Sequence, residues 1–407
     1  MTAVVGYVPF SGAGPTSETG FLRAAFGCTL VLPRMALGLN RSEPPDIDLA
    51  RSALVPMCEL AHVFAEGPGG MLAGAVLRSL GFRGRLTLIP YLNPHRFEHL
   101  AAARWYASFA APGDSVWLGS PRSAALWRTL GVPARVGEPY GIDGTRFRLR
   151  PGANAVRARL GLPPQGQLLM YAGRIEADKD VGRLLRVALK ARLLFPDLVV
   201  ALATHRVTAA DADCLRQTLG PEAGIHLILD PAAKDLADLY CSADVFVTAA
   251  TSSLETFGRA AAEALACGTP VVAPDYDGFA HVLDQPGGHL VPLTWHGDDP
   301  TLPEDRLLRA VYEVLSAPLP PDRAAIAAAA TRFDRAHTLK QLAAVFEAEI
   351  RPPAPLPEAP FRIPPDYAEA LRTLPPIPEA SALSGPLPDP ASLIRAVRRA
   401  LGAAGCR

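Results

Sequence analysis

The sequence has few features of a membrane, metal-binding or nucleic-acid-binding protein. No apolar run among its 407 residues approaches the roughly 18 residues of a membrane span, and the first residues have no basic flank. The six cysteines are dispersed, without the paired spacing of a metal site. Positive and negative side chains balance at 40 each, so no overall field attracts nucleic acid. We therefore expect a cytoplasmic protein with reduced thiols and no nucleic-acid partner.

Residues 1–150 have a mild positive bias. They contain 15 arginines and no lysine against 10 acidic residues. This excess can serve an anionic substrate or a membrane surface, and scattered solvated arginines are the alternative interpretation. Membrane association is thus left open, but nothing else in the sequence indicates it.

Strand-like and helix-like segments alternate along most of the chain. This alternation predicts an α/β fold with parallel, doubly wound sheets and ligands at the carboxyl ends of the strands. Proline, glycine and charge meet at residues 148–154, which we take as a domain boundary. The predicted domains are residues 1–150 and 151–350, followed by a tail of 351–407. In the second domain, one helix is expected at 304–315 and another at 322–347.

The tail has a different composition from the rest of the chain. Of the 39 residues from 352 to 390, 13 are proline, which favours an extended linker. A short helix is predicted after Asp389-Pro390, with an apolar stripe that needs a partner. A disordered tail whose helix binds another protein is one interpretation of this stripe.

The most informative stretch predicts a strand, a polar loop and a helix with two glutamates. A strand at 243–248 precedes the loop, and an alanine-rich helix follows Gly258. The start of a helix favours a phosphate, and a carboxylate beside it can accept hydrogen bonds from sugar hydroxyls. Eight residues of helix span about 12 Å, so Glu255 and Glu263 could contact two rings joined by a diphosphate. The stretch therefore predicts a site for a nucleotide-diphosphate sugar.

Two cations are expected at a second strand-to-helix turn. Arg174 follows a predicted strand at 167–172, and Lys179 comes five residues later. Together they can neutralise a diphosphate whose charge grows as the bond to the sugar breaks. The alternative is a surface loop with paired charges, because Glu176 and Asp178 lie between them.

These motifs resemble those of the retaining glycosyltransferases of glycosyltransferase family 4. The similarity covers about residues 115–350 and rests on four stretches: Glu138-Pro-Tyr-Gly-Ile-Asp143, Tyr171-Ala-Gly-Arg-Ile-Glu-Ala-Asp-Lys179, Glu255 to Glu263 with Phe257-Gly258, and Gly268-Thr-Pro-Val-Val272. The resemblance implies the GT-B fold, in which two Rossmann-like domains face a cleft. It also implies that the end of the chain crosses back onto the first domain, which would cover the apolar stripe of the tail.

The resemblance assigns a role to each motif. Glu255 would bind donor-sugar hydroxyls and Glu263 the nucleotide ribose. Helix capping is the alternative for Glu255, and an ion pair with Arg259 is the alternative for Glu263. The remaining donor-binding candidates are the turn glycine before Arg174, the amides that follow Glu255 and the glycine-rich loop after the first strand: Gly173, Thr256, Phe257, Gly258, Gly12 and Gly14.

In the first domain, His95 is the candidate for the catalytic histidine that many family members have near the sugar. It departs in register from the family pattern, and Asn93 is the substitute. The family mechanism needs no protein nucleophile, because the departing phosphate helps to deprotonate the acceptor. Two Asp-x-Asp pairs, Asp211-Ala-Asp213 and Asp275-Tyr-Asp277, match a metal motif only superficially. With Arg174 and Lys179 present we expect neither a metal nor a cofactor, only the nucleotide-diphosphate sugar as co-substrate.

The sequence thus predicts a retaining, metal-independent glycosyltransferase. The acceptor is expected to be a small molecule, a glycan or a natural-product scaffold. An epimerase, an enzyme of pseudo-glycosidic coupling and a non-catalytic nucleotide-sugar-binding or scaffold protein are the alternatives. A dinucleotide dehydrogenase is disfavoured because Gly12-Ala-Gly14 lacks the third glycine of the usual fingerprint.

Overall fold

The structure, a computed structural model, describes residues 5–8, 30–31, 47–94, 97–137, 141–152, 155–205, 224–252, 254–296 and 299–347. It divides into two compact units. Of the described residues, unit 1 comprises those up to Gly137 together with those from Ala336 to Glu347, and unit 2 comprises those of Gly141–Arg335. The predictions for Gly12, Gly14, His95 and the tail at 351–407 lie outside the described residues.

Unit 1 contains a six-stranded parallel sheet in the order β2-β1-β3-β4-β5-β6. The order runs outward in both directions from the β1–β3 pair, as in a doubly wound sheet. The strands are β1 Val5–Val8, β2 Leu30–Val31, β3 His62–Glu66, β4 Arg85–Ile89, β5 Ser115–Leu118 and β6 Ala134–Val136. The helices are α2 Ile47–Leu54, the 3₁₀ turn η2 Val55–Met57, α3 Gly67–Ser79, α4 Phe97–Phe109, α5 Pro121–Thr129 and α14 Arg335–Glu347.

Small residues allow α3 to pack tightly in unit 1. The helix begins at Gly67, so the stretch Gly67-Pro-Gly-Gly70 forms its first turn. A Cβ at Gly70 would lie 2.9 Å from the carbonyl carbon of Ala65, which shows how closely the helix approaches β3. Aliphatic and aromatic side chains of α2, α3, α4 and α5 pack on the central strands to form the core.

A buried ion pair joins α3 to the residue before β5 in unit 1. Arg78 on α3 bonds the carboxylate of Asp114, and both side chains are almost fully buried. Asp114 also accepts a hydrogen bond of 2.9 Å from the Tyr106 hydroxyl and one of 2.9 Å from the amide of Ala111. The charge on Asp114 is thus compensated on several sides, as a buried charge requires.

Unit 2 contains a second six-stranded parallel sheet, in the order β12-β11-β10-β7-β8-β9. From β7 the chain proceeds outward to β8 and β9, and from β10 it proceeds in the opposite direction to β11 and β12. The topological switch point is therefore between β7 and β10. The strands are β7 Leu168–Ala172, β8 Val199–Thr204, β9 Ile225–Leu229, β10 Val245–Val247, β11 Val271–Pro274 and β12 Gly288–Val291, with a separate hairpin of β13 Thr294–His296 and β14 Asp299–Thr301.

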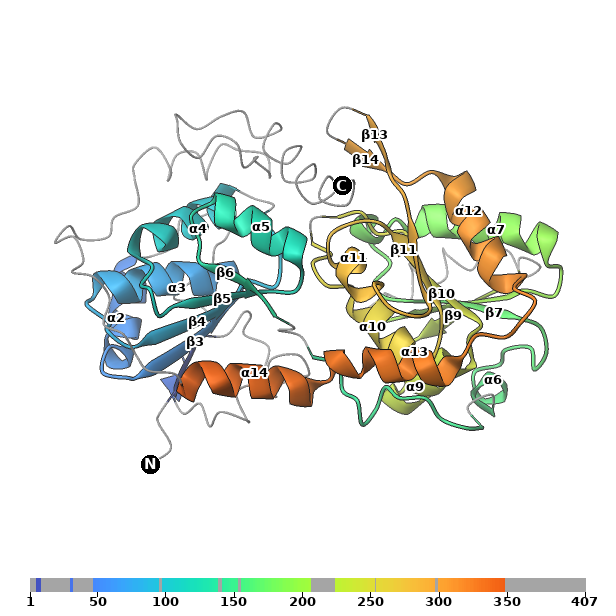
Figure 1. Ribbon diagram of the computed structural model, residues 1–407, viewed down its shortest axis with the longest axis horizontal. Helices are drawn as coiled ribbons and strands as arrows, with labels where there is room; N and C mark the ends of the chain where they lie inside the picture. Colours follow the sequence, from blue (N-terminus) through green and yellow to red (C-terminus); the bar gives the residue numbers. More distant parts are fainter. Residues whose placement is uncertain are drawn as a thin grey trace. The chain divides into compact units, whose positions relative to one another are not determined.

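Helices cover both faces of the unit 2 sheet (Figure 1). On one face, α7 and α12 enclose an apolar core with β7, β8 and β10. On the other face, α10 contacts α9 and α13, and α6 contacts α9. The helical segments are α6 Ala155–Arg159, η3 Ala177–Lys179, α7 Val181–Leu194, α9 Ala233–Ser242, α10 Arg259–Ala266, α11 Gly278–Val282, α12 Glu304–Leu315, α13 Arg323–Ala330 and η5 Thr331–Phe333.

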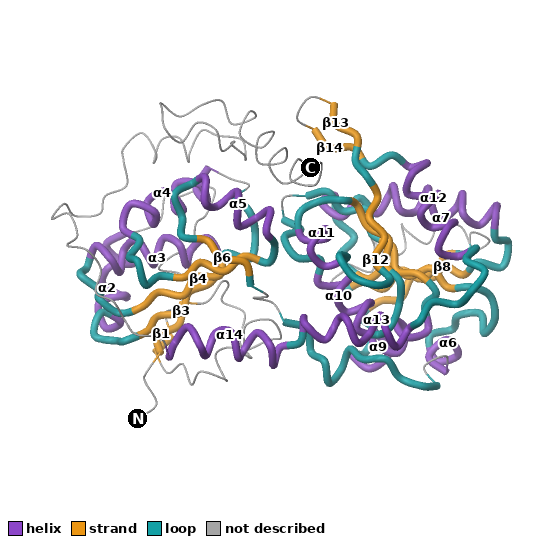
Figure 2. The backbone as a smooth tube through the Cα atoms, viewed as in Figure 1, coloured by secondary structure: helices purple, strands orange, loops and turns teal. Residues whose placement is uncertain are grey.

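The division between the units falls earlier in the chain than the predicted boundaries at 150 and 350. The segment expected as a linker packs on α9 instead, since the Arg148 carbonyl accepts from Cys241 Sγ at 3.3 Å and Arg150 pairs with Asp238 at 3.1 Å. At the other end, the chain leaves unit 2 after Arg335, and most of α14 belongs to unit 1 (Figure 2).

The prediction of a single helix at 322–347 was wrong. The structure has α13, then η5, then an extended residue, Asp334, before α14 begins. Asp334 forms a parallel bridge with Ile142, whose amide donates to the Phe333 carbonyl at 2.7 Å. At this point, backbone contacts with the distant residue Ile142 replace the hydrogen bonds of a helix. The local sequence does not show that Ile142 will be a neighbour.

Candidate functional site

The predicted donor-binding residues follow the two strands that flank the switch point of unit 2. Arg174 and Lys179 come after β7, and Glu255 comes after its neighbour β10. In doubly wound sheets ligands bind outside the carboxyl ends of the strands at such a point. The topology therefore places these residues where a ligand of this fold is expected.

Lys179 and Glu255 meet at this edge. The Lys179 ammonium lies 2.7 Å from Glu255 Oε2, and the two side chains are 16% and 18% exposed. Burial alone would lower the pKa of Lys179, but the carboxylates of Glu255 and Asp178 outweigh it, so the pKa is raised. Lys179 is therefore held as a cation beside two carboxylates.

Arg174 has two carboxylate partners. One terminal nitrogen bonds Glu176, and the other donates to Asp178 at 3.1 Å. This is the charge pairing that the sequence indicates as the alternative to phosphate binding. Against the effect of burial, Asp178 and Glu176 raise the pKa of Arg174.

The turn that carries Arg174 depends on Gly173. The Tyr171 hydroxyl donates to the Arg174 carbonyl at 2.7 Å and so fastens the turn to the end of β7. A Cβ at Gly173 would lie 2.7 Å from this hydroxyl oxygen and would displace it. Gly173 is thus required for the path of the chain, and its predicted contact with the donor stays a prediction.

Glu255 also binds the loop that precedes α10. Its Oε1 accepts from the Gly258 amide at 2.9 Å, which binds the loop at the residue before the first turn of α10. Gly258 is the N-cap of α10 with φ 84°, a conformation that glycine adopts without strain. One carboxylate thus orients both a cation from the β7 turn and an amide at the start of α10.

The start of α11 packs directly against this segment. A Cβ at Gly278 would lie 2.4 Å from both the nitrogen and the Cα of Phe257. The Phe257 ring is buried and packs edge-on against Phe333 at 5.6 Å. Together with the nearly buried Thr256, these contacts fix the backbone that was predicted to present amides to the donor phosphates.

Glu263 lies on α10 and is buried among polar partners. Its carboxylate accepts from the Tyr240 hydroxyl at 3.2 Å and from Arg259 Nε at 3.2 Å. Burial and the nearby Glu263 carboxylate raise the pKa of Tyr240. The ion pair with Arg259 is the expected alternative role of Glu263, and its contact with a ribose stays a prediction.

Asn93 in unit 1 has a structural role. It is fully buried, and its side-chain oxygen accepts from the Trp127 indole at 3.2 Å. Sequence reasoning missed two supporting contacts, that of the Tyr171 hydroxyl with Arg174 and that of Tyr240 with Glu263, and neither had a signal in the sequence. It named Asp178 as a charge partner, but not that this carboxylate contacts both cations.

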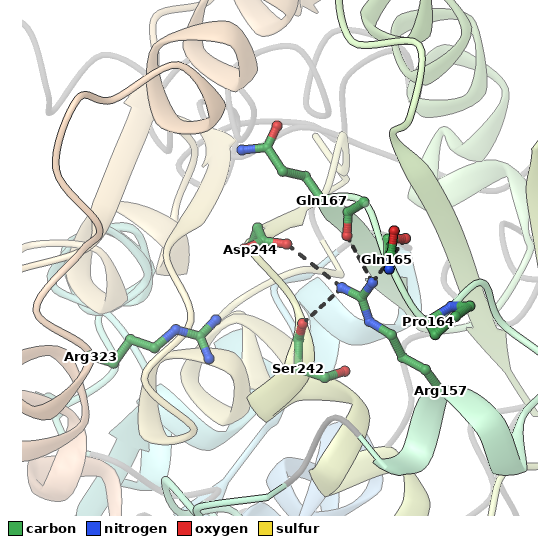
Figure 3. A pocket seen from close by; sticks show the side chains of 8 residues that line it. Arg157, Pro164, Gln165, Gln167, Ser242, Asp244 and Arg323 are labelled. Atoms are coloured by element: carbon green, nitrogen blue, oxygen red, sulfur yellow. Dashed lines mark hydrogen bonds and ion pairs between the residues drawn. The ribbon is translucent and has the colours of Figure 1, made fainter.

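A cavity of about 440 Å³ lies at the opposite edge of the unit 2 sheet (Figure 3). Its lining comes from the amino ends of β7 and β10, from α6 and from the start of α13, and contains none of the predicted residues. Arg157 and Arg323 bond the carbonyls of Cys241, Ser242 and Ala243. These arginines therefore hold the turn between α9 and β10, at the negative end of a helix.

The described residues contain no group of three or more His, Cys, Asp or Glu side chains arranged for a metal ion. In the same part of the chain, no helix has the length and apolar character needed to cross a membrane.

Comparison with known proteins identifies the part of the chain that carries this site. Residues 153–293 match the family model described as "Glycosyl transferases group 1". This segment is a glycosyl transferases group 1 domain. It contains every predicted site residue of unit 2, from Gly173 to Glu263.

Curated relatives match part of the chain. Phosphatidyl-myo-inositol mannosyltransferase from Mycobacterium tuberculosis is 36% identical over 218 residues, or 51% of this chain and 53% of that protein. D-inositol 3-phosphate glycosyltransferase from Streptomyces bingchenggensis is 35% identical over 162 residues, covering 37% and 35% of the two chains. The chain thus spans about half the length of the first of these relatives and a third of the second.

Solved structures match over most of the chain and establish the fold. Sucrose-phosphate synthase from Thermosynechococcus elongatus has a TM-score of 0.63 at 18% identity, covering 84% of this chain and 98% of its own. Anabaena HepE, solved with UDP and glucose, has a TM-score of 0.64 at 18% identity and the same coverage. The predicted α/β GT-B fold and the resemblance to group 1 glycosyltransferases are confirmed.

Proposed function

We propose that this protein is a retaining glycosyltransferase that moves a sugar from a nucleotide-diphosphate sugar to an acceptor hydroxyl. The observation that carries the proposal is the meeting of Lys179 and Glu255 at the switch point, 2.7 Å apart. A cation for a diphosphate and a carboxylate for sugar hydroxyls are thereby adjacent. A nucleotide-diphosphate sugar needs both, because its diphosphate is anionic and its sugar carries hydroxyl groups.

The chemistry follows from the charges at the site. When the glycosidic bond breaks, negative charge grows on the departing diphosphate, and Lys179 with Arg174 stabilises it. Glu255 orients Lys179 and accepts hydrogen bonds from the sugar, which holds the reacting carbon near the acceptor. The leaving phosphate oxygen accepts the acceptor's proton on the face that it vacates, so the anomeric configuration is retained. The two cations make a divalent metal unnecessary for this step.

The names of the relatives support the choice of substrates for a first assay. HepE was solved with UDP-glucose, and two curated relatives are named for mannosyl transfer to phosphatidylinositol and for glycosyl transfer to inositol phosphate. The donor belongs to the nucleotide-diphosphate sugars, and the acceptor is a small molecule, a glycan or a natural product. Inositol-bearing compounds are the first acceptors to test. The proposed compartment is the cytoplasm.

The proposal is tested with a panel of nucleotide-diphosphate sugars, first by thermal shift and then by transfer from labelled donor. A donor at 100 times its dissociation constant should stabilise the protein by about 2.7 kcal/mol. Glu255→Ala should reduce transfer by roughly a hundredfold or more while the protein stays folded. Glu304→Ala, on the outer helix α12, serves as the matched control and should leave transfer unchanged.

Analysis of the products tests the finer parts of the proposal. Nuclear magnetic resonance of the product should show the anomeric configuration of the donor, and a chelator should not reduce the rate. Unchanged turnover in Glu255→Ala would remove the basis of the proposal. A rearranged free sugar formed without acceptor would show epimerase chemistry instead.

A further inference from the structure

The Asp178 carboxylate lies between the two cations of the candidate donor site. Its Oδ2 is 3.1 Å from a terminal nitrogen of Arg174 and 3.6 Å from Lys179 Nζ. Asp178 belongs to the one-turn segment η3, Ala177–Lys179, which brings it back toward the end of β7. One oxygen atom therefore contacts both groups that are proposed to bind the diphosphate.

The second partner of Arg174 differs from Asp178 in exposure. Glu176 bonds the other terminal nitrogen of the guanidinium, and its side chain is 54% exposed, against 15% for Asp178. An exposed ion pair contributes little because water screens it, whereas a nearly buried carboxylate with two cationic partners is held in place. The contact of Arg174 with Glu176 is thus the weaker of the two, and its contact with Asp178 is the stronger.

The net charge of the cluster requires one of these contacts to break when a donor binds. Two cations, Arg174 and Lys179, face three carboxylates, Glu176, Asp178 and Glu255, which leaves a net charge of −1. A diphosphate adds further negative charge and needs free N–H donors. The exposed Glu176 contact is the one that breaks most readily, and it frees the solvent-facing end of Arg174.

We propose that Asp178 and Glu176 have opposite roles in donor binding. Asp178 is a positioning residue, which holds Arg174 and Lys179 in convergent orientation and stays in place when the donor binds. Glu176 is a placeholder, whose carboxylate occupies the position on Arg174 that a phosphate oxygen takes. This inference rests on the proposed function and adds to it the group that orders the diphosphate site and the group that the donor displaces.

Two matched variants, Asp178→Asn and Glu176→Gln, test the proposal. Each replaces a carboxylate by its amide within the same turn. The dissociation constants of UDP and GDP are measured by isothermal titration for the full chain and for each variant. Glu176→Gln should tighten nucleotide binding by about threefold, the scale of an exposed ion pair. Asp178→Asn should weaken it by about tenfold, because the two cations lose their common partner.

Kinetics separate positioning from a general effect of charge. Glu176→Gln should act mainly through a lower KM for the donor sugar. Asp178→Asn should also lower kcat, because misplaced cations stabilise the departing diphosphate less well. Asp178→Glu keeps the charge and should recover part of the lost activity. Thermal denaturation of each variant shows whether it is folded. If Asp178→Asn does not fold, Glu176→Gln still tests the role of Glu176.

The outcomes distinguish this inference from the proposed function. If both amide variants tighten binding, Asp178 is only a repulsive charge and the positioning role is wrong. If Glu176→Gln weakens binding, the placeholder role is wrong. In both cases a wild-type chain that binds nucleotide and transfers sugar keeps its proposed function. A wild-type chain that binds no nucleoside diphosphate would overturn the proposed function and this inference together.

Discussion

Lys179 and Glu255 form an ion pair of 2.7 Å although 76 residues separate them in the chain. The pair joins the turns after β7 and β10, two neighbouring strands whose onward connections run in opposite directions across the sheet. It is the point at which the two motifs singled out in the sequence meet. Its properties can therefore be tested by changing either partner.

The ion pair predicts an unusual pH dependence. Because Glu255 and Asp178 raise the pKa of Lys179, its charge and its contribution to folding stability are complete below about 10.4, the usual lysine pKa. Both are lost only as the pH rises through the higher folded-state pKa. The contribution of Lys179 to UDP affinity should therefore persist to about pH 10. In Glu255→Gln a neutral amide replaces the carboxylate, so less negative charge offsets the effect of burial on Lys179. The pKa of Lys179 should then be lower than in wild type, and UDP affinity should fall at a lower pH. Titrations between pH 7 and 11 measure both curves, and parallel curves would contradict the prediction.

Gly278 predicts a steric route to loss of binding. In Gly278→Ala the new methyl group would meet the Phe257 backbone at 2.4 Å, so the loop before α10 must move. We expect weaker nucleotide binding, by about tenfold or more, and destabilisation of about 1–3 kcal/mol. Gly182→Ala in the first turn of α7 is the control, because its Cβ would meet only the Arg186 side chain, at an ordinary 3.6 Å, and should leave stability about unchanged. Equal nucleotide affinity in the two variants would refute the predicted coupling.

The buried Arg78–Asp114 pair predicts a large effect on unit 1. Asp114→Asn leaves Arg78 buried without its charge partner, which should cost about 3–5 kcal/mol of unfolding free energy. Tyr106→Phe removes one neutral donor to Asp114 and should cost about 1–2 kcal/mol. Urea denaturation of both variants gives the comparison. A cost below 1 kcal/mol for Asp114→Asn would mean that other groups compensate Arg78.

Glu304 predicts a small acid-dependent contribution to stability. Lys190 and Arg186 lower the pKa of Glu304 to about 2, and all three side chains lie at the solvent-facing side of α7 and α12. The contribution of a carboxylate with a lowered pKa is present above its unfolded value of about 4.3 and lost as the pH falls toward 2. Water screens these pairs, so Glu304→Gln should cost no more than about 1 kcal/mol at pH 7. In denaturation series, the difference from wild type should shrink between pH 4.5 and 2.

The candidate site could be predicted from the sequence where its residues follow strongly patterned elements. The apolar run before Thr248 and the glycine at 258 define a strand, a loop and a helix, and the structure has β10 and α10 there. The contacts that complete the site depend on which strands are neighbours. Nothing local places Tyr240 beside Glu263 or Lys179 beside Glu255, because those pairs form only when the sheet is assembled.

The fold was predictable to a similar degree. Alternating strands and helices indicate two doubly wound sheets, and both are present. The break between α13 and α14 has one local signal, since Asp334 is a favoured type of residue directly before a helix, but its bridge with Ile142 depends on a distant segment. Boundaries set by tertiary contacts are the part of a fold that periodicity does not show.

The bridge between Ile142 and Asp334 makes the ends of unit 2 neighbours. The Arg335 amide donates to the Ile142 carbonyl at 2.9 Å, and Arg335 pairs with Asp143 at 3.5 Å, so the first and last residues of Gly141–Arg335 are fastened together. A module whose two ends adjoin can be excised, circularly permuted or transplanted into another host without stretching its chain. Unit 2 can therefore be exchanged for another domain during evolution while the sheet of unit 1 is left unchanged.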